Sequence, residues 1–315
     1  MYKEECEEKL RNLVIHAWDD EIKWPQIEQW AENFIGTAFD QERERDHGLF
    51  ALTRFMYFGR RLVRELLRSL YRDHFEAPLM QRIRRNYGSE TSGAVLRSAY
   101  SSELASTRFI GVGNPAESGA HLLYFFRQVN HLSKELFSDI HEAFVVRLDE
   151  SGRERYEQRN GGVSRYVFFD DLVGSGDQVS QYLKTSLRAI RQGTPEVELR
   201  FLSLFATSAG IDRLNEKQLF DGKAFCLFEL DDSYKAFDAN SRYFSGAPEW
   251  FVLNDLQQLA RVYGSALQPR RALGYKDGQL LLGFSHNTPD NTLPIFWDEG
   301  IRHPWSPVFQ RYDKK

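Results

Sequence analysis

The chain has 315 residues, of which 42% are hydrophobic and 27% charged, as in an ordinary folded globular protein. Its formal net charge of −4 excludes a protein whose whole surface binds nucleic acid, although a local basic patch is compatible with it. Two cysteines, Cys6 and Cys226, cannot build a disulfide framework, and no Cys/His spacing is that of a zinc site, so we expect a reducing, cytoplasmic compartment. The acidic start of the chain lacks the apolar core of a signal peptide, and no apolar stretch approaches the ~20 residues of a membrane span.

Residues 1–104 carry apolar side chains at spacings of three and four, which predict a helical N-terminal region. The expected helices are Leu10–Ala17, Trp24–Phe34 and Leu49–Tyr71, and the last is the longest pattern in the chain.

Arginines are concentrated in residues 51–100, where ten arginines and no lysine stand against four acids, a local charge of +6. Arginine favours bidentate contacts with phosphate or carboxylate. The Arg-rich helix Arg54–Arg72 therefore has two interpretations: a surface for a nucleic acid or protein partner, or a set of ion pairs with the acidic N-terminal region.

Strand-like runs alternate with helical patterns over residues 105–315, which predicts an α/β domain with a mostly parallel sheet and a C-terminal extension. The expected strands are Arg108–Gly113, Ala143–Leu148, Tyr166–Phe169, Val197–Phe205, Phe225–Leu230 and Leu280–Phe284. The expected helices are Ser118–Leu136, Asp177–Arg191, Ile211–Leu219 and Trp250–Tyr263.

Residues 165–183 predict a strand, a turn and a helix, with Asp170 and Asp171 at the carboxyl end of the strand. Ligands bind at that end in open α/β sheets. A glycine turn at residues 174–176 lets the backbone approach an anion, and the first N–H groups of the following helix have no intrahelical partners. Two carboxylates beside such a phosphate site suit hydrogen bonds to hydroxyls or a nearby divalent cation, as a ribose 5-phosphate would require. The alternative is a glycine turn that merely caps the helix.

This order of four apolar residues, two acids, three variable positions, a Ser and a Gly resembles the phosphoribosyl-pyrophosphate motif of type I phosphoribosyltransferases. The resemblance implies the sheet of that family, phosphoribosyl pyrophosphate or a nucleotide as ligand, and Mg²⁺ as cofactor. It implies that Asp170 and Asp171 contact the ribose hydroxyls and neighbour the Mg²⁺ indirectly. The residues implied for the 5-phosphate are Gly174, Ser175, Gly176, Asp177 and Gln178. Gln178 departs from the family pattern, which usually has Thr or Ser there.

Two further segments stand where that family has functional loops. The turn that contains Gly113, Asn114, Ser118 and Gly119 is expected to bind pyrophosphate, or else to be a plain capped turn. The polar stretch 150–162 is expected to be a mobile lid, or else an idle surface loop. Its three arginines, Arg153, Arg155 and Arg159, suit an anionic substrate, but it has no Lys, which family members often use.

Residues for the acceptor side are harder to assign. Thr207 and Ser208 follow the strand Val197–Phe205 and either line an acceptor pocket or cap a helix. His286 and Asn287 lie in an irregular tail with two Pro, where a structural role is the alternative.

The chain resembles, more specifically, phosphoribosyltransferase-like proteins of bacterial conflict systems, including some encoded beside retron reverse transcriptases. The segments that carry this resemblance are Gly59-Arg60-Arg61, the helix start from Ser118-Gly119 to Tyr124-Phe125-Phe126-Arg127, and the tail Gly283–Pro294. The resemblance implies an effector of anti-phage defence, with a reverse transcriptase or nucleic-acid complex as partner through Arg54–Arg72. The alternatives are a nucleotide sensor without turnover and a structural subunit of a nucleoprotein defence complex.

Overall fold

The computed structural model of the protein describes residues 2–88, 92–112, 118–148, 150–152, 154–300 and 304–312. The chain divides into two compact units, one from Met1–Val63 with Leu230–Lys315 and the other from Arg64–Glu229. This division differs from the predicted boundary at residue 104, because both ends of the chain share one unit and the middle of the chain forms the other. Among the described residues, no helix is long and apolar enough to cross a lipid bilayer.

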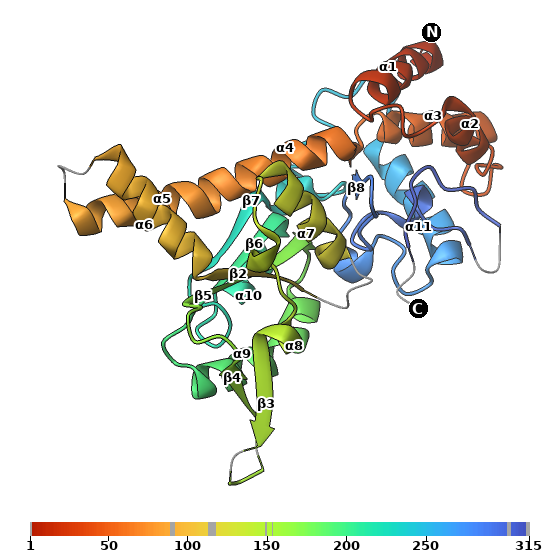
Figure 1. The fold of residues 1–315 in the computed structure, drawn as a ribbon. Helices are drawn as coiled ribbons and strands as arrows, with labels where there is room; N and C mark the ends of the chain where they lie inside the picture. Colours follow the sequence, from red (N-terminus) through yellow and green to blue (C-terminus); the bar gives the residue numbers. More distant parts are fainter. Residues whose placement is uncertain are drawn as a thin grey trace. The chain divides into compact units, whose positions relative to one another are not determined.

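The middle unit contains a four-stranded sheet (Figure 1). Its strands are β2 (Thr107–Gly111), β5 (Arg165–Val173), β6 (Glu198–Thr207) and β7 (Ala224–Leu230), in the order β2-β5-β6-β7. β2 pairs in parallel with β5, and β5 pairs in parallel with β6. The predicted α/β class, with a mostly parallel sheet after a helical N-terminal region, is therefore confirmed.

The helical segments of this unit are α4 (Arg60–Tyr71), the π-helix η1 (Arg72–Glu76), α5 (Ala77–Tyr87), α6 (Gly93–Ala105), α7 (Ser118–Val129), the 3-10 turn η2 (Lys134–Leu136), α8 (Ile140–Ala143), α9 (Asp177–Gly193) and α10 (Ser208–Leu214). Of these, α7 and α9 pack on the two faces of the sheet. On one face the ring of Phe126 lies 5.0 Å from that of Phe169. On the other face Phe168 shares a core with Leu183 and Leu187 of α9. Because successive strand residues point to opposite faces, β5 is buried on both sides and reads as a continuous apolar run.

Aromatic contacts attach the helices before β2 to the sheet. The ring of Phe75 in η1 lies 5.1 Å from that of Phe109 in β2. The ring of Tyr71 in α4 lies 5.7 Å from that of Phe126 in α7. Residues 64–105, which the sequence assigned to a separate N-terminal region, therefore belong to the unit that contains the sheet.

The other unit is formed by the two ends of the chain. Its elements are α1 (Tyr2–His16), α2 (Trp24–Ala31), α3 (Gln41–Leu52), β1 (Met56–Phe58), η3 (Asp232–Tyr234), α11 (Leu253–Leu267), η4 (Tyr275–Asp277), β8 (Leu282–Phe284) and η5 (Pro294–Phe296). Trp30 stacks on Phe296 at 5.4 Å, and its indole N–H donates to the carbonyl of Ile295 at 2.7 Å. Phe55 stacks on Phe309 at 4.1 Å. The C-terminal segment thus completes the core of the first helices instead of extending the sheet.

The long helix predicted over Leu49–Tyr71 is wrong. α3 ends at Leu52, α4 begins at Arg60, and β1 lies between them, paired in parallel with β8. The N–H of Met56 donates to the carbonyl of Leu281 at 2.8 Å. The strand ends at Phe58 and is followed by Gly59, where an added Cβ would overlap the carboxylate of Asp19. The pairing partner of β1 lies far along the chain, so local spacing alone gave no sign of a strand.

The polar stretch 150–162 was expected to be a loop, but it contains β4 (Glu154–Gln158). This strand pairs with β3 (Phe144–Leu148) in an antiparallel sheet of two strands. Tyr156 is the buried side chain of β4. Backbone pairing with β3 supports the strand without an apolar alternation of its own.

Candidate functional site

The strand, turn and helix predicted over residues 165–183 are present as β5, a turn and α9. Asp170 and Asp171 lie inside the last part of β5, because the strand continues to Val173. Asp171 is buried, whereas Asp170 is partly exposed. Oδ1 of Asp170 accepts the N–H of Asp171 at 2.9 Å, and Oδ1 of Asp171 accepts the N–H of Leu172 at 2.7 Å. These bonds orient both carboxylates at the carboxyl edge of the sheet.

The turn after β5 brings the chain into the start of α9 through a left-handed residue. Gly176 has a φ of +71°, a conformation that glycine adopts without steric cost. Its carbonyl accepts the N–H of Ser180 at 2.8 Å, the first bond of the helix. α9 is 17 residues long, so the positive end of its dipole and its first N–H groups are presented at the turn. Ser175 lies in this turn, and Asp177 and Gln178 begin the helix.

α10 supports the turn from the neighbouring strand. The hydroxyl of Thr207 donates to the carbonyl of Gly174 at 2.6 Å and accepts the N–H of Gly210 at 3.0 Å. An added Cβ at Gly210 would overlap the carbonyl oxygen of Gly174. The helix-capping interpretation of Thr207 is thus confirmed, and Ser208 is the first residue of α10. Their assignment to the acceptor side stays a prediction.

One charged residue of the site was missed in the sequence. The hydroxyl of Ser175 donates to Oδ2 of Asp177 at 3.0 Å, and Nη1 of Arg213 lies 2.5 Å from Oδ1 of Asp177. Arg213 is in α10, after β6. Since β5 and β6 are parallel neighbours, the segments that follow them meet at one edge of the sheet. That rule, applied to the predicted strands, would have pointed to the residues after β6.

The segment predicted to bind pyrophosphate starts at the same edge. The N–H of Val112, just after β2, donates to the carbonyl of Phe169 at 2.9 Å, next to Asp170 in the sequence. Gly113 and Asn114 lie outside the described residues, whereas Ser118 and Gly119 open α7. The ends of three neighbouring strands therefore meet at the proposed ligand edge.

The predicted lid is anchored elsewhere on the unit. The hydroxyl of Thr194 donates to the carbonyl of Tyr156 at 3.4 Å, at the C-terminal end of α9. The turn lies at the other end of that helix, and 17 residues span roughly 25 Å. Arg155 belongs to β4, and Nε of Arg159 donates to the carbonyl of His141 at 3.4 Å. Arg153 lies outside the described residues, and the lid stays a prediction.

His286 and Asn287 belong to the unit formed by the chain ends. The ring of His286 stacks on Phe284 at 5.2 Å. Oδ1 of Asn287 accepts the N–H of Tyr312 at 3.2 Å. These contacts give both side chains a structural role within their own unit, and their place on the acceptor side stays a prediction.

Most arginines of the segment Arg54–Arg72, which was predicted as one Arg-rich helix, have acidic partners. The ion pairs are Arg60–Glu21, Arg61–Asp19, Arg68–Glu65 and Arg72–Asp73. The first two join the start of α4 to the acidic N-terminal region, as the ion-pair interpretation predicted. A partner at this helix is a prediction that these contacts leave open.

The carboxylates near the turn suit a metal ion that is bound partly by the phosphates of the substrate. In the part of the chain that the structure describes, no group of three His, Cys, Asp or Glu side chains is arranged to hold a metal ion. Mg²⁺ is commonly bound by one or two carboxylates together with substrate phosphates. Asp170, partly exposed at the sheet edge, fits that mode.

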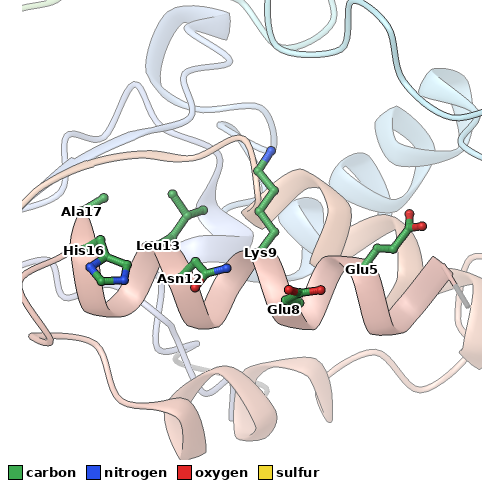
Figure 2. A pocket seen from close by; sticks show the side chains of 7 residues that line it. All are labelled: Glu5, Glu8, Lys9, Asn12, Leu13, His16 and Ala17. Carbon is green, nitrogen blue, oxygen red and sulfur yellow. The ribbon is translucent and has the colours of Figure 1, made fainter.

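A depression open to solvent lies in the other unit, on α1 (Figure 2). The side chains that Figure 2 labels come from this helix and from the residue that follows it: Glu5, Glu8, Lys9, Asn12, Leu13, His16 and Ala17. The depression is therefore a face of α1.

The chain is similar to one protein family and to several solved structures. The sequence model of the family PRTase-CE matches residues 27–311. No curated protein sequence matches the chain. Among solved structures, the xanthine-guanine-hypoxanthine phosphoribosyltransferase of Helicobacter pylori matches at 12% identity and a TM-score of 0.28, over 56% of this chain and 86% of that chain.

Two further solved structures match in the same way. The orotate phosphoribosyltransferase of Aeropyrum pernix matches at 16% identity and a TM-score of 0.24, over 42% of this chain and 73% of that chain. The AQ2163 protein of Aquifex aeolicus matches at 13% identity and a TM-score of 0.29, over 67% of this chain and 86% of that chain.

Proposed function

Because this chain belongs to the PRTase-CE family, which is phosphoribosyltransferase-like, we propose that it binds phosphoribosyl pyrophosphate with Mg²⁺ and transfers the phosphoribosyl group to an acceptor. The observation that carries the proposal is the arrangement at the end of β5. There, Asp170 and Asp171 stand at the carboxyl edge of a parallel sheet, and a left-handed glycine turn follows that opens a long helix.

Different residues at this edge bind different groups of the ligand. The carboxylates of Asp170 and Asp171 accept hydrogen bonds from the ribose 2- and 3-hydroxyls. The N–H groups at the start of α9 bind the 5-phosphate, which also interacts favourably with the helix dipole. The segment after β2 binds the pyrophosphate. This order suits the sheet, because β2 and β5 are neighbours and end at the same edge.

The reaction breaks the bond between the ribose anomeric carbon and the pyrophosphate oxygen and forms a bond from the acceptor to that carbon. Pyrophosphate leaves with the electron pair, and the acceptor loses its proton. Mg²⁺, when bound, supplies positive charge to the leaving pyrophosphate. The aspartates hold the ribose ring while positive charge develops at the anomeric carbon, and their negative charge favours that state.

A role as an effector of bacterial anti-phage defence completes the proposal. The support is the resemblance of Gly59-Arg60-Arg61, the start of α7 and the tail Gly283–Pro294 to proteins of conflict systems. In the structure, Gly59 follows β1 and Arg61 pairs with Asp19. The tail is held by a hydrogen bond of 2.6 Å from the hydroxyl of Thr292 to the carbonyl of Leu282. Gly59-Arg60-Arg61 and the tail therefore belong to the unit formed by the chain ends, whereas the start of α7 belongs to the unit that contains the sheet.

A second candidate is a nucleotide sensor that binds without turnover. Asp177 favours it, because a carboxylate in the first turn of α9 repels a phosphate and weakens binding at that point. The absence of Lys from residues 150–162 favours it as well. Release of pyrophosphate distinguishes the two candidates, since only the transferase produces it.

Calorimetric titration with phosphoribosyl pyrophosphate and Mg²⁺ tests the site. The variant Asp170→Asn/Asp171→Asn should lose binding, because neutral amides attract neither the hydroxyl protons nor the metal as strongly. The matched control is Asp212→Asn/Glu216→Gln, which removes two exposed acids nearby in the chain and should bind like the wild type. Equal affinity in the Asp170/Asp171 variant would remove the site assignment. Absence of binding in the wild-type protein would remove the proposed ligand.

A further inference from the structure

The hairpin of α5 and α6 carries a concentration of positive charge that the proposed site does not use. From Ala77 to Ala105 the hairpin contains four arginines and two acids, Glu90 and Glu103, a charge of +2. α5 and α6 project beyond the sheet of their unit (Figure 1). The net charge of the whole chain has the opposite sign, −4.

Pairing divides these arginines into two groups. Arg82, at the base, pairs with Glu103 at 2.9 Å and with Glu198 at 3.5 Å. Arg84, Arg85 and Arg97 are exposed, and within the described part of the chain they form no ion pair. The hairpin therefore uses one arginine for its own structure and leaves three positive charges to solvent.

The three exposed arginines gather at one end of the hairpin. Arg84 and Arg85 lie in the last turn of α5. Arg97 reaches back toward the first residue of α6, where an added Cβ on Gly93 would lie 3.4 Å from its Nη1. The end of α5 and the start of α6 are the same end of the hairpin. Together the three side chains define a basic tip.

Aromatic and apolar surface accompanies the charge. Tyr87, the last residue of α5, is 58% exposed, and Val95 in the first turn of α6 is 44% exposed. Arginine beside an exposed aromatic ring is the combination with which proteins hold a nucleic-acid strand, through phosphate contacts and base stacking. The negative end of the α5 dipole also favours arginines in its last turn, but that interaction does not account for Arg97 in α6.

We propose that the basic tip, Arg84, Arg85 and Arg97, binds the phosphate backbone of single-stranded nucleic acid. This surface is different from the Arg-rich helix Arg54–Arg72, where the arginines of four ion pairs are already neutralised. It is also independent of phosphoribosyl transfer, because none of its residues lies at the end of β5. Three phosphate contacts predict a slope of about −2 for the logarithm of the binding constant against the logarithm of the salt concentration.

The test is fluorescence anisotropy of the full chain with a short single-stranded oligonucleotide of mixed sequence, over a range of salt concentrations. The variant Arg84→Ala/Arg85→Ala/Arg97→Ala should bind at least tenfold more weakly at low salt, with a slope near zero. The matched control is Lys184→Ala/Arg188→Ala/Lys217→Ala, which removes three exposed cations from α9 and the segment after α10. It should keep the affinity and the slope of the wild type.

Circular dichroism and the thermal midpoint check that the exposed arginines were removed without unfolding the hairpin. Wild-type protein that does not bind the oligonucleotide at low salt would overturn the proposal, as would equal loss in the control. Binding of polyglutamate in place of the oligonucleotide would also overturn it and would assign the tip to an acidic protein.

Discussion

The guanidinium of Arg213 lies 2.5 Å from the carboxylate of Asp177, so the helix after β6 is joined by charge to the first residue of the helix after β5. The same carboxylate accepts a hydrogen bond from Ser175 at 3.0 Å. The carboxylate of Asp177 therefore links the turn to α10. A bound 5-phosphate would compete with the carboxylate of Asp177 for the positive charge of Arg213 and for the positive end of the α9 dipole.

This competition predicts that Asp177→Asn strengthens phosphate binding. Removing one negative charge from the start of a helix should raise the affinity for ribose 5-phosphate about two- to fivefold. Calorimetry with ribose 5-phosphate measures it, and an affinity equal to or below that of the wild type would contradict the competition.

Arg213→Ala is expected to have the opposite effect. With Asp177 left unneutralised beside the turn, ribose 5-phosphate should bind roughly five- to tenfold more weakly. The double variant with Asp177→Asn separates two roles for the arginine. Recovery of wild-type affinity would mean that Arg213 only neutralises Asp177, whereas a persistent loss would mean that it contacts the phosphate.

Gly210→Ala should damage the turn through packing alone. An added Cβ would overlap the carbonyl oxygen of Gly174, so α10 and the turn must separate. We expect a loss of about 1–3 kcal/mol in the free energy of unfolding and a weaker affinity for ribose 5-phosphate. Gly161→Ala is the matched control, because a Cβ there meets no atom within 4 Å. A stability of Gly210→Ala equal to that control would show that the turn has room to relax.

Much of the candidate site could be predicted from the sequence because its signals are local. The run Tyr166–Phe169 is apolar because both faces of β5 are buried, and the glycine of the turn is required by the left-handed conformation of residue 176. Arg213 could not be found in this way. It contacts Asp177 only because β5 and β6 pair in parallel. The residue spacing within the two strand–helix segments does not predict that pairing.

The rest of the fold escaped prediction for related reasons. β1 has three residues and pairs with β8, which lies far along the chain. Its apolar residues were therefore predicted to belong to a helix. β4 has one buried side chain, Tyr156, and its strand conformation comes from pairing with β3. The predicted boundary near residue 104 took no account of contacts between the two ends of the chain, such as the packing of Trp30 against Phe296.

A buried ionic network lies at the start of β5 and β6, at the other end of these strands from the candidate site, and predicts a loss of stability in acid. Glu198 pairs with Arg165 at 2.7 Å and with Arg200 at 2.8 Å, and Arg165 is only 3% exposed. Burial alone would raise the pKa of Glu198, but the charges of Arg200 and Arg165, with their hydrogen bonds, lower the pKa from 4.5 to about 2. Because the folded pKa is the lower one, this stabilisation is complete above pH 4.5 and is lost as the pH falls toward 2.

Glu198→Gln tests the network. The variant leaves the buried guanidinium of Arg165 without part of its counter-charge, so the free energy of unfolding at neutral pH should fall by about 3 kcal/mol. Urea unfolding as a function of pH should also show a shallower loss in acid than the wild type. Parallel curves for the two proteins below pH 4.5 would contradict the assignment of the acid sensitivity to Glu198.

His47 makes a corresponding prediction for the other unit. Its ring is 1% exposed, Nδ1 lies 2.9 Å from the carbonyl of Arg43, and Nε2 lies 3.2 Å from the N–H of Val252. Nδ1 must then carry the proton and Nε2 must accept, which requires the neutral ring. Burial lowers the pKa of His47 below 6.5, although the hydrogen bond to Arg43 and the charge of Asp255 oppose the shift. Because only the unfolded chain takes up this proton readily, stability should decline as the pH falls below 6.5. A titration of the imidazole signal by NMR measures the pKa directly, and a midpoint at or above 6.5 would mean that the ring accepts a proton while buried and that the bond from Val252 is not essential.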